Sequence, residues 1–328
     1  MPPSASTPLR IVFMGTPSFA LPSFEALAAS DEIITVVTQP DRPKGRGEIL
    51  TPPPIKVAAL QRAIPLLQPE RIRKDPAFIE HLISLAPDLA VVVAFGQILP
   101  ESVLKIPRFG CINLHGSLLP KYRGAAPIQW ALIEGEKETG VTTIQMDAGM
   151  DTGPILLKQS VSIEPDETAG QLAGRMAEVG ASLLEETLSF LKAGKLNPMP
   201  QDHSKATLAP LLKKEDGYIR WEEGAEAIVN RDRGVTPWPG TTTFYEGKRW
   251  KINALRIGSR DGKWGAPGEI VRLSERGLEV AAGIGYILIN EMQPEGGRRM
   301  SVQAYAAGHP IQERSVLGST GHTKEESP

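Results

Sequence analysis

The sequence predicts an α/β fold in which a Rossmann-like domain with a parallel sheet precedes a small C-terminal β-barrel. In the first two-thirds of the chain, strand-like apolar runs alternate with helical patterns, which favours a parallel sheet covered by helices. After residue 240, short alternating runs follow one another at regular spacing, as in small barrels. A length of 328 residues also exceeds what one core usually spans, so two domains are expected.

Four strands are expected in the first domain, and the third is apolar almost throughout, as a strand buried on both faces should be. Ligands of such sheets bind beyond the carboxyl ends of the strands, so the segments that follow the strands are candidate site segments. The expected strands are Leu9–Met14, Ile33–Thr38, Asp88–Ala94 and Cys111–His115, and the expected helices are Pro22–Ala29, Ile55–Arg62, Ala77–Leu85 and Ile128–Ile133.

A longer helical pattern, Thr168–Lys192, is expected to close the first domain, with Gly194 as its stop signal. The segment that follows contains three prolines and has the composition of a linker. The expected barrel strands are Thr241–Tyr245, Trp250–Arg256, Glu269–Leu273, Gly277–Ala281 and Tyr286–Met292. We therefore expect a first domain over residues 1–194, a linker over 195–210, a barrel domain over 211–314 and a disordered polar tail over 315–328.

The composition is that of an ordinary globular protein in water, with 41% hydrophobic and 23% charged residues. No apolar run approaches the roughly 20 residues that a membrane span needs, so no membrane partner is expected. The first residues have neither a signal-peptide nor a transit-peptide pattern, which favours a cytoplasmic location. The single cysteine, Cys111, excludes an intramolecular disulfide and a zinc site built from several cysteines, and it is expected in the core. No feature demands an interface, so a monomer is expected.

The charge is unevenly distributed along a chain whose net charge is −2 at pH 7. Residues 1–202 hold 18 Lys and Arg against 22 Asp and Glu, whereas the remaining residues hold 18 against 16. The more basic C-terminal part is compatible with a polyanionic partner, and equally with an ordinary solvated surface.

Two short segments flanked by glycines carry the candidate catalytic groups. Asn113 and His115 alternate with apolar residues at the end of an expected strand, so their side chains should share one face. Asp151 lies in a later segment, residues 147–153. An amide, an imidazole and a carboxylate can together polarise a carbonyl, stabilise charge on its oxygen and take a proton from an attacking amine. Acyl transfer to an amine needs that combination, with no metal and no covalent nucleophile.

The first glycine-containing turn, Gly15-Thr16-Pro17-Ser18, follows the first expected strand. It lacks the second and third glycines of a dinucleotide-binding fingerprint. A nicotinamide-dependent dehydrogenase is disfavoured for that reason.

The candidate segments resemble a known family. Asn113-Leu-His-Gly-Ser-Leu-Leu-Pro120, followed by Asp151-Thr-Gly153, is similar to the signature of the 10-formyl-tetrahydrofolate-dependent formyltransferases. Within that family, Lys121–Ala131 and Thr38–Gly47 resemble the methionyl-tRNA formyltransferases. The resemblance continues to Pro237-Trp-Pro-Gly240 and covers roughly residues 9 to 310.

The resemblance implies an α/β catalytic domain that binds folate and a C-terminal barrel of the oligonucleotide-binding (OB) type that helps to hold tRNA. It implies 10-formyl-tetrahydrofolate as co-substrate and formyl donor, with no metal. The implied acceptor is the α-amino group of methionine at the acceptor end of initiator methionyl-tRNA. The implied process is translation initiation.

The resemblance also implies catalytic roles. Asn113 and, when protonated, His115 would donate hydrogen bonds to the formyl oxygen, and Asp151 would be the base, directly or through a water. Asp147 in the same loop competes for the role of base, although loop capping suits it better. The residues expected to contact folate are Phe95, Gly96, Ile98, Leu99, Pro100, Ser117, Leu118, Leu119 and Pro120.

A basic segment, Pro40–Gly47, matches the insertion loop with which the family contacts the tRNA acceptor end, and Arg46 matches the chief arginine of that loop. Arginine can pair with phosphate and stack on an unpaired base. An ordinary exposed loop is the alternative. The residues expected to contact tRNA are Arg42, Lys44, Arg46, Lys213, Lys214, Arg231 and Lys248.

Three alternative functions stay open. The chain could be a formyltransferase that acts on an amino-sugar nucleotide, glycinamide ribonucleotide or another small amine. It could be a non-catalytic RNA-binding protein, although the presence of Asn113, His115 and Asp151 together argues against this. It could also be a folate-binding hydrolase, since the same three groups can deliver water to a formyl carbon.

Overall fold

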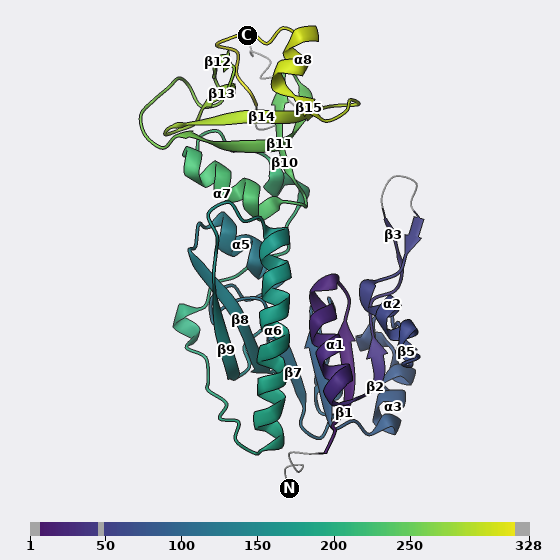
Figure 1. Cartoon of the computed structure of the whole chain (residues 1–328). Coiled ribbons are helices and arrows are strands. Elements are labelled where there is room, and N and C mark those ends of the chain that lie inside the picture. The colour runs from purple at the N-terminus through teal and green to yellow at the C-terminus, as the bar shows by residue number, and fades with distance from the viewer. Residues whose placement is uncertain (1–6, 45–48, 319–328) are drawn as a thin grey trace. The chain divides into compact units, whose positions relative to one another are not determined.

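The chain forms two compact units in the computed structural model (Figure 1). The structure describes residues 7–44 and 49–318. The units differ from the contiguous domains expected from the sequence in two short segments, which belong to the second unit. The first unit contains the described residues within 1–127, 138–163 and 172–210, and the second contains those within 128–137, 164–171 and 211–328.

The centre of the first unit is a seven-stranded mixed sheet with the strand order β5-β2-β1-β6-β7-β8-β9. Strands from β5 to β7 pair in parallel, whereas β8 pairs antiparallel with both β7 and β9. The four expected strands are confirmed as β1, β2, β6 and β7. The strands are β1 (Arg10–Gly15), β2 (Glu32–Val37), β5 (Leu66–Leu67), β6 (Leu89–Val93), β7 (Cys111–His115), β8 (Glu138–Gln145) and β9 (Ile155–Ser162).

The sequence did not reveal β8 and β9, because polar residues interrupt their apolar pattern. Two buried threonines of β8 satisfy their hydroxyls within the fold: Thr142 donates to the carbonyl of Ser117 at 2.6 Å, and Thr143 shares a hydrogen bond of 2.9 Å with Thr187. A buried hydroxyl costs little free energy when it is hydrogen-bonded. The prediction of parallel pairing is therefore right for its four strands, to which the unpredicted β5 adds a fifth, and the edge with β8 and β9 makes the sheet mixed.

The expected helices are confirmed to within one residue at each end. At the start of α3, the Asp75 carboxylate accepts a hydrogen bond of 2.9 Å from the N–H of Phe78, and Pro76 occupies the first helical position. Gly194 follows the end of α6 with φ +65°, as its expected stop role requires. The helices of the first unit are α1 (Leu21–Ser30), α2 (Pro54–Gln61), α3 (Pro76–Leu85), α4 (Glu101–Leu104) and most of α6 (Ala169–Lys192), with short 3-10 turns at Ser18–Ala20, Ile72–Lys74 and His203–Lys205.

Helix α6 covers one face of the sheet at β7 and β8. A Cβ atom built on Gly180 would lie 2.7 Å from Leu114, and Thr187 bonds Thr143. Since successive residues of a strand point to opposite faces, His115 and its cross-strand partner Thr142 point away from α6. That opposite face is left to the loops that follow β7 and β8. None of the described helices is long and apolar enough to cross a membrane.

The segment expected as a basic loop, Pro40–Gly47, contains β3 (Arg42–Lys44), which pairs antiparallel with β4 (Ile49–Thr51) just beyond it. Asp41 anchors its base by accepting hydrogen bonds of 3.0 Å from Gln68 and 2.8 Å from Lys56. These two donors hold the pKa of Asp41 below its usual value. The hairpin is thus tied to the edge of the sheet.

The second unit is built on a second, antiparallel sheet with the order β10-β11-β14-β13-β12. All five expected barrel strands are confirmed. The sheet encloses a core in which Trp221 and Trp250 are each 1% exposed. Its elements are α5 (Pro127–Ile133), a 3-10 turn (Lys214–Gly217), α7 (Ala225–Val235), β10 (Thr241–Tyr245), β11 (Lys248–Ser259), β12 (Ile270–Ser274), β13 (Gly277–Ala281), β14 (Tyr286–Pro294), β15 (Met300–Ser301) and α8 (Val302–Gly308).

The first residues of the expected disordered tail are instead part of the second unit. Gly318 exchanges hydrogen bonds of 3.0 and 2.7 Å with Phe244 on β10, and the N–H of Leu317 donates to Gly268, beside β12, at 2.8 Å. Residues 315–318 therefore connect the two edge strands of the sheet. The tail prediction failed here because Val316-Leu317 is too short an apolar run to stand out in a polar sequence, yet Leu317 is 1% exposed in the core. Residues 319–328 lie outside the described residues.

Replacing Leu317 should destabilise the second unit. We expect Leu317→Ala to lower the free energy of unfolding by about 3 kcal/mol, because it removes buried methyl groups and leaves a cavity. The neighbouring Val316 is 54% exposed, so Val316→Ala should change the free energy of unfolding little. Urea denaturation of both variants measures the difference, and equal midpoints would contradict the role of residues 315–318 in the core.

One carboxylate of the second unit, that of Asp232, has a raised pKa. Asp232 on α7 keeps partial solvent exposure, and its Oδ1 accepts a hydrogen bond of 2.5 Å from the hydroxyl of Thr241. Burial disfavours the charged form and raises the pKa of Asp232 from 3.8 to about 6, although Thr241 and Arg233 act in the opposite direction. The folded protein therefore binds this proton more tightly than the unfolded chain does.

A carboxylate with a raised pKa makes the protein lose stability as pH rises. The loss should begin near the unfolded pKa of 3.8 and be complete above the folded value of about 6. Asp232→Asn keeps an oxygen acceptor for Thr241. Its free energy of unfolding should exceed that of the parent by about 2 kcal/mol at pH 8 and equal it near pH 4. Urea unfolding across this range is the test, and parallel pH curves for parent and variant would contradict the assignment.

Candidate active site

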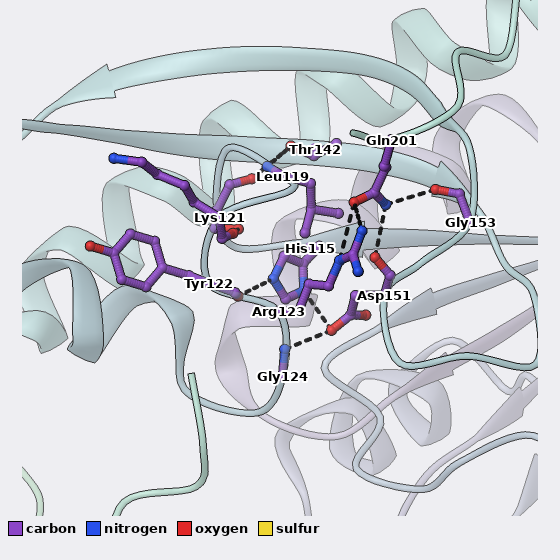
Figure 2. Close-up of polar contacts among 11 residues, drawn as sticks. His115, Leu119, Lys121, Tyr122, Arg123, Gly124, Thr142, Asp151, Gly153 and Gln201 are labelled. Atoms are coloured by element: carbon purple, nitrogen blue, oxygen red, sulfur yellow. Dashed lines mark hydrogen bonds and ion pairs between the residues drawn. The ribbon is translucent and has the colours of Figure 1, made fainter. Parts of the chain in front are cut away.

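The three expected catalytic residues lie together in the first unit. Asn113 and His115 are 9% and 5% exposed on β7, on the face opposite α6. The loop that joins β8 to β9 folds back along β7, so that Oδ2 of Asp151 lies 3.6 Å from Nδ1 of His115. Figure 2 shows the imidazole and the carboxylate facing each other.

Both nitrogens of His115 have neighbours that set the role of the ring. Nε2 lies 2.8 Å from the carbonyl oxygen of Tyr122 (Figure 2). A carbonyl only accepts, so Nε2 must carry a proton, and Nδ1 is the nitrogen that faces Asp151. Tyr122 presents this carbonyl from a left-handed conformation with φ +60°. In this arrangement Nε2 is bound to a backbone oxygen, whereas Nδ1 faces the Asp151 carboxylate at 3.6 Å, beyond hydrogen-bond distance.

Asp151 is fixed through one of its two carboxylate oxygens. Oδ2 accepts a hydrogen bond of 2.8 Å from the N–H of Gly124 and is the oxygen that faces His115. Among the described residues, Oδ1 has no hydrogen-bond partner. The backbone of Asp151 is itself left-handed, with φ +55°, which costs free energy in a residue with a side chain and therefore needs surrounding contacts to hold it.

The carboxamide of Asn113 is a second polar group of the site without a partner among the described residues. It is nearly buried, yet it makes no hydrogen bond to any other residue that the structure describes. Its amide atoms are not among the fully buried polar atoms that lack a partner, so solvent or a ligand can reach them. An unpaired amide beside His115 is therefore available to a ligand oxygen.

Asp147, the competing carboxylate, caps its own loop. Its Oδ1 accepts hydrogen bonds of 3.0 Å from the N–H of Gly149 and 2.6 Å from the hydroxyl of Thr152. The side chain is therefore engaged within residues 147–152, as the loop-capping interpretation expects.

The two groups of residues expected to bind folate differ in exposure. Phe95 and Leu99 are 2% and 4% exposed and belong to the core of the first unit, so their side chains are packing residues. Ile98 is 63% exposed. Gly96 is also exposed, and Pro100 is half-buried. In this segment the exposed backbone at Gly96 and the side chain of Ile98 can contact a ligand, whereas the buried side chains of Phe95 and Leu99 cannot.

The second group forms the loop after β7. Leu118 and Pro120 are half-buried, whereas Ser117 and Leu119 are fully buried. The hydroxyl of Ser117 donates to the carbonyl of Lys121 at 2.6 Å, and Thr142 bonds both Ser117 and Leu119. Residues 117–121 are thereby held in one conformation against β8.

The residues expected to contact tRNA are mostly exposed, with one clear exception. Arg231 is 9% exposed, and its Nη2 forms an ion pair of 3.1 Å with Glu223. Its charge is therefore not presented to a phosphate. Lys44 ends β3, and Arg46 lies outside the described residues. The exposed members of the set are Arg42, Lys213, Lys214 and Lys248.

Sequence reasoning missed the groups that orient the candidate catalytic residues. The carbonyl of Tyr122 and the N–H of Gly124 are backbone atoms, which no side-chain pattern reveals. Gly124 has φ +118°, and a Cβ atom there would lie 2.8 Å from the carbonyl oxygen of Ala209. Gly124, after Arg123, was thus the one sequence feature that could have indicated a special backbone conformation here. Gln201, in the expected linker, had no signal at all.

Two other sequence expectations concern Cys111 and metals. Cys111 is buried, and burial raises the pKa of its thiol to about 12, so it is a core residue. Within residues 7–44 and 49–318, no group of three or more His, Cys, Asp and Glu side chains is arranged to hold a metal ion.

The chain is similar to known formyltransferases over nearly all of its length. The family model described as formyl transferase matches residues 9–188, and the one described as formyl transferase, C-terminal domain, matches residues 211–310. Methionyl-tRNA formyltransferase of Geobacter sulfurreducens is 50% identical over 314 residues, which are 95% of this chain and 98% of the relative. That of Syntrophus aciditrophicus is 51% identical over 311 residues, which are 94% of this chain and 99% of the relative.

Solved structures share the fold at low sequence identity. An N-formyltransferase from Helicobacter canadensis, in complex with folinic acid and dTDP-3-aminofucose, gives a TM-score of 0.67 at 16% identity, over 86% of this chain and 98% of its own. HypX from Aquifex aeolicus, in complex with tetrahydrofolic acid, gives a TM-score of 0.62 at 16% identity. The match covers 48% of HypX. With both family models matched in order and full-length relatives at half identity, the chain belongs to the formyl transferase family.

Proposed function

We propose that this protein transfers the formyl group of 10-formyl-tetrahydrofolate to the α-amino group of methionine on initiator methionyl-tRNA, for translation initiation in the cytoplasm. The relatives of about 50% identity carry the name methionyl-tRNA formyltransferase. The structural observation that carries the chemistry is the unpaired, nearly buried carboxamide of Asn113 beside the facing pair of His115 and Asp151.

Asn113 is the proposed donor to the formyl oxygen. When the amine attacks the formyl carbon, negative charge gathers on that oxygen, and an N–H fixed in advance stabilises it without reorganisation. Loss of one such donor typically raises the barrier by about 3 kcal/mol. Asn113 suits this role because its carboxamide has no partner within the described chain to give up.

Asp151 is the proposed base. Its Oδ2 is held by Gly124 and faces His115, which leaves Oδ1 to take the proton that the attacking amine loses. The bond between the formyl carbon and the folate nitrogen then breaks, and that nitrogen gains a proton. Since Tyr122 occupies Nε2, we assign His115 to orient Asp151 and to share its proton through Nδ1.

The substrates are proposed to meet the loops around this site. The formyl donor is assigned to the exposed backbone at Gly96, to Ile98 and Pro100, and to the loop of residues 117–120. The acceptor end of the tRNA is assigned to the β3–β4 hairpin with Arg42, Lys44 and Arg46. Exposed lysines of the second unit supply further phosphate contacts. They are Lys213, Lys214 and Lys248.

The acceptor is tested by offering two tRNAs and a small amine. We expect the protein to formylate initiator methionyl-tRNA and to act far more slowly on elongator methionyl-tRNA, with labelled formyl transfer from 10-formyl-tetrahydrofolate as the measurement. An amino-sugar nucleotide serves as the comparison substrate. Formylation of the sugar in place of either tRNA would overturn the proposed acceptor, and formate release without an acceptor would identify a hydrolase.

The base is tested with two isosteric changes in one loop. Asp151→Asn should lower kcat by about 100-fold or more, because an amide oxygen cannot take the proton. Asp147→Asn keeps an oxygen acceptor for Gly149 and Thr152, so kcat should stay near that of the parent. Steady-state kinetics of both variants decide the matter. Near-normal turnover of Asp151→Asn would remove it from the mechanism, and a collapse confined to Asp147→Asn would transfer the role there.

A further inference from the structure

Gln201 joins the expected linker to the loop that carries Asp151. It is 6% exposed, and its Nε2 donates hydrogen bonds of 2.8 Å to the carbonyls of both Asp151 and Gly153 (Figure 2). Its Oε1 accepts from Nε and Nη2 of Arg123, at 3.2 and 2.6 Å. Both ends of the carboxamide are thus fully used.

The direction of this carboxamide follows from its partners. Arg123 can only donate, so the atom that faces it must be the oxygen, and two carbonyls can only accept, so the atom that faces them must be the nitrogen. Neither glutamate nor a hydrophobic residue could meet both requirements. A neutral side chain with a donor end and an acceptor end is needed at this position.

Arg123 is itself held rigidly against the same segment. Its N–H donates to the carbonyl of Thr207 at 2.8 Å, and its own carbonyl accepts from the N–H of Ala209 at 2.7 Å. Arg123 is 6% exposed, and its Nη2 also donates to Nδ1 of His203 at 3.2 Å. No carboxylate among the described residues forms an ion pair with it. The buried charge is therefore supported by neutral acceptors, chiefly Gln201.

This arrangement bears on Asp151 because its backbone is strained. A non-glycine residue at φ +55° keeps that conformation only if its neighbours hold it. Gln201 donates a hydrogen bond to the backbone carbonyl of Asp151. The N–H of Gly124, next to Arg123, donates to the carboxylate of Asp151. Arg123 and Gln201 together close a ring of contacts around the catalytic carboxylate.

We propose that Gln201 is a positioning residue that holds Asp151 in its reactive conformation, with Arg123 as its anchor. Residues 199–209 are then part of the catalytic centre and not merely a connection. This inference rests on the proposed function, since the base that Gln201 positions is the base of formyl transfer.

The test separates the two ends of the carboxamide. Gln201→Glu keeps an oxygen for Arg123 but replaces the donor by a second oxygen, which repels the carbonyls of Asp151 and Gly153. We expect kcat to fall about 100-fold, as for a displacement of about 1 Å at a reacting group, while KM for both substrates changes little. Gln159→Glu, the same change at an exposed position on β9, is the matched control and should leave kcat unchanged.

A double-mutant cycle distinguishes positioning from general stabilisation. If Gln201 acts through Asp151, Gln201→Glu should cost little further activity in the Asp151→Asn background. An unchanged kcat for Gln201→Glu would overturn the inference. Full additivity of the two changes would also overturn it, as would a loss of melting temperature with raised KM values. Failure of the unaltered protein to formylate methionyl-tRNA would instead overturn the proposed function.

Discussion

The hydrogen bond from Nε2 of His115 to the carbonyl of Tyr122 is the interaction on which the site depends. It fixes which nitrogen carries the proton and turns the other toward Asp151. Tyr122 can offer its carbonyl only because the chain after β7 bends back through a left-handed residue. The bend is secured by bonds from Ser117 and Thr142. His115 therefore lies at the end of a sheet strand, and the following loop sets the protonation and orientation of its ring.

Because Nε2 of His115 is bound to the carbonyl of Tyr122 while Nδ1 faces Asp151, the division of roles that we propose differs from the one inferred from residue types alone. An imidazole next to an amide suggests two donors to one oxygen. In the proposed mechanism, Asn113 binds the oxygen and His115 is instead the partner of Asp151, which lies 3.6 Å from its Nδ1. Asp151 in turn depends on Gly124 and Gln201, which lie far from it in sequence. In the proposed mechanism, polar contacts across the loops therefore matter as much as the three named side chains.

The sequence predicted the parallel strands and helices well, because their apolar patterns are continuous. It missed β8, where Thr142 and Thr143 replace apolar residues and are stabilised by hydrogen bonds that the sequence cannot show. It placed Leu317 in a tail because two adjacent apolar residues, Val316 and Leu317, make no periodic pattern. For the site, side-chain chemistry pointed to Asn113, His115 and Asp151. The backbone donors and acceptors that orient them depend on long-range folding, which no local pattern records.

The most direct test of this account is a crystal structure of the protein with folinic acid, a formyl-folate that cannot complete the transfer. The account predicts that the amide nitrogen of Asn113 lies about 3 Å from the formyl oxygen. It also predicts that Nε2 of His115 stays bound to the carbonyl of Tyr122 and that Oδ1 of Asp151 faces the open side of the formyl carbon. A structure in which His115 leaves Tyr122 to bind the formyl oxygen, with Asn113 remote from it, would contradict the account.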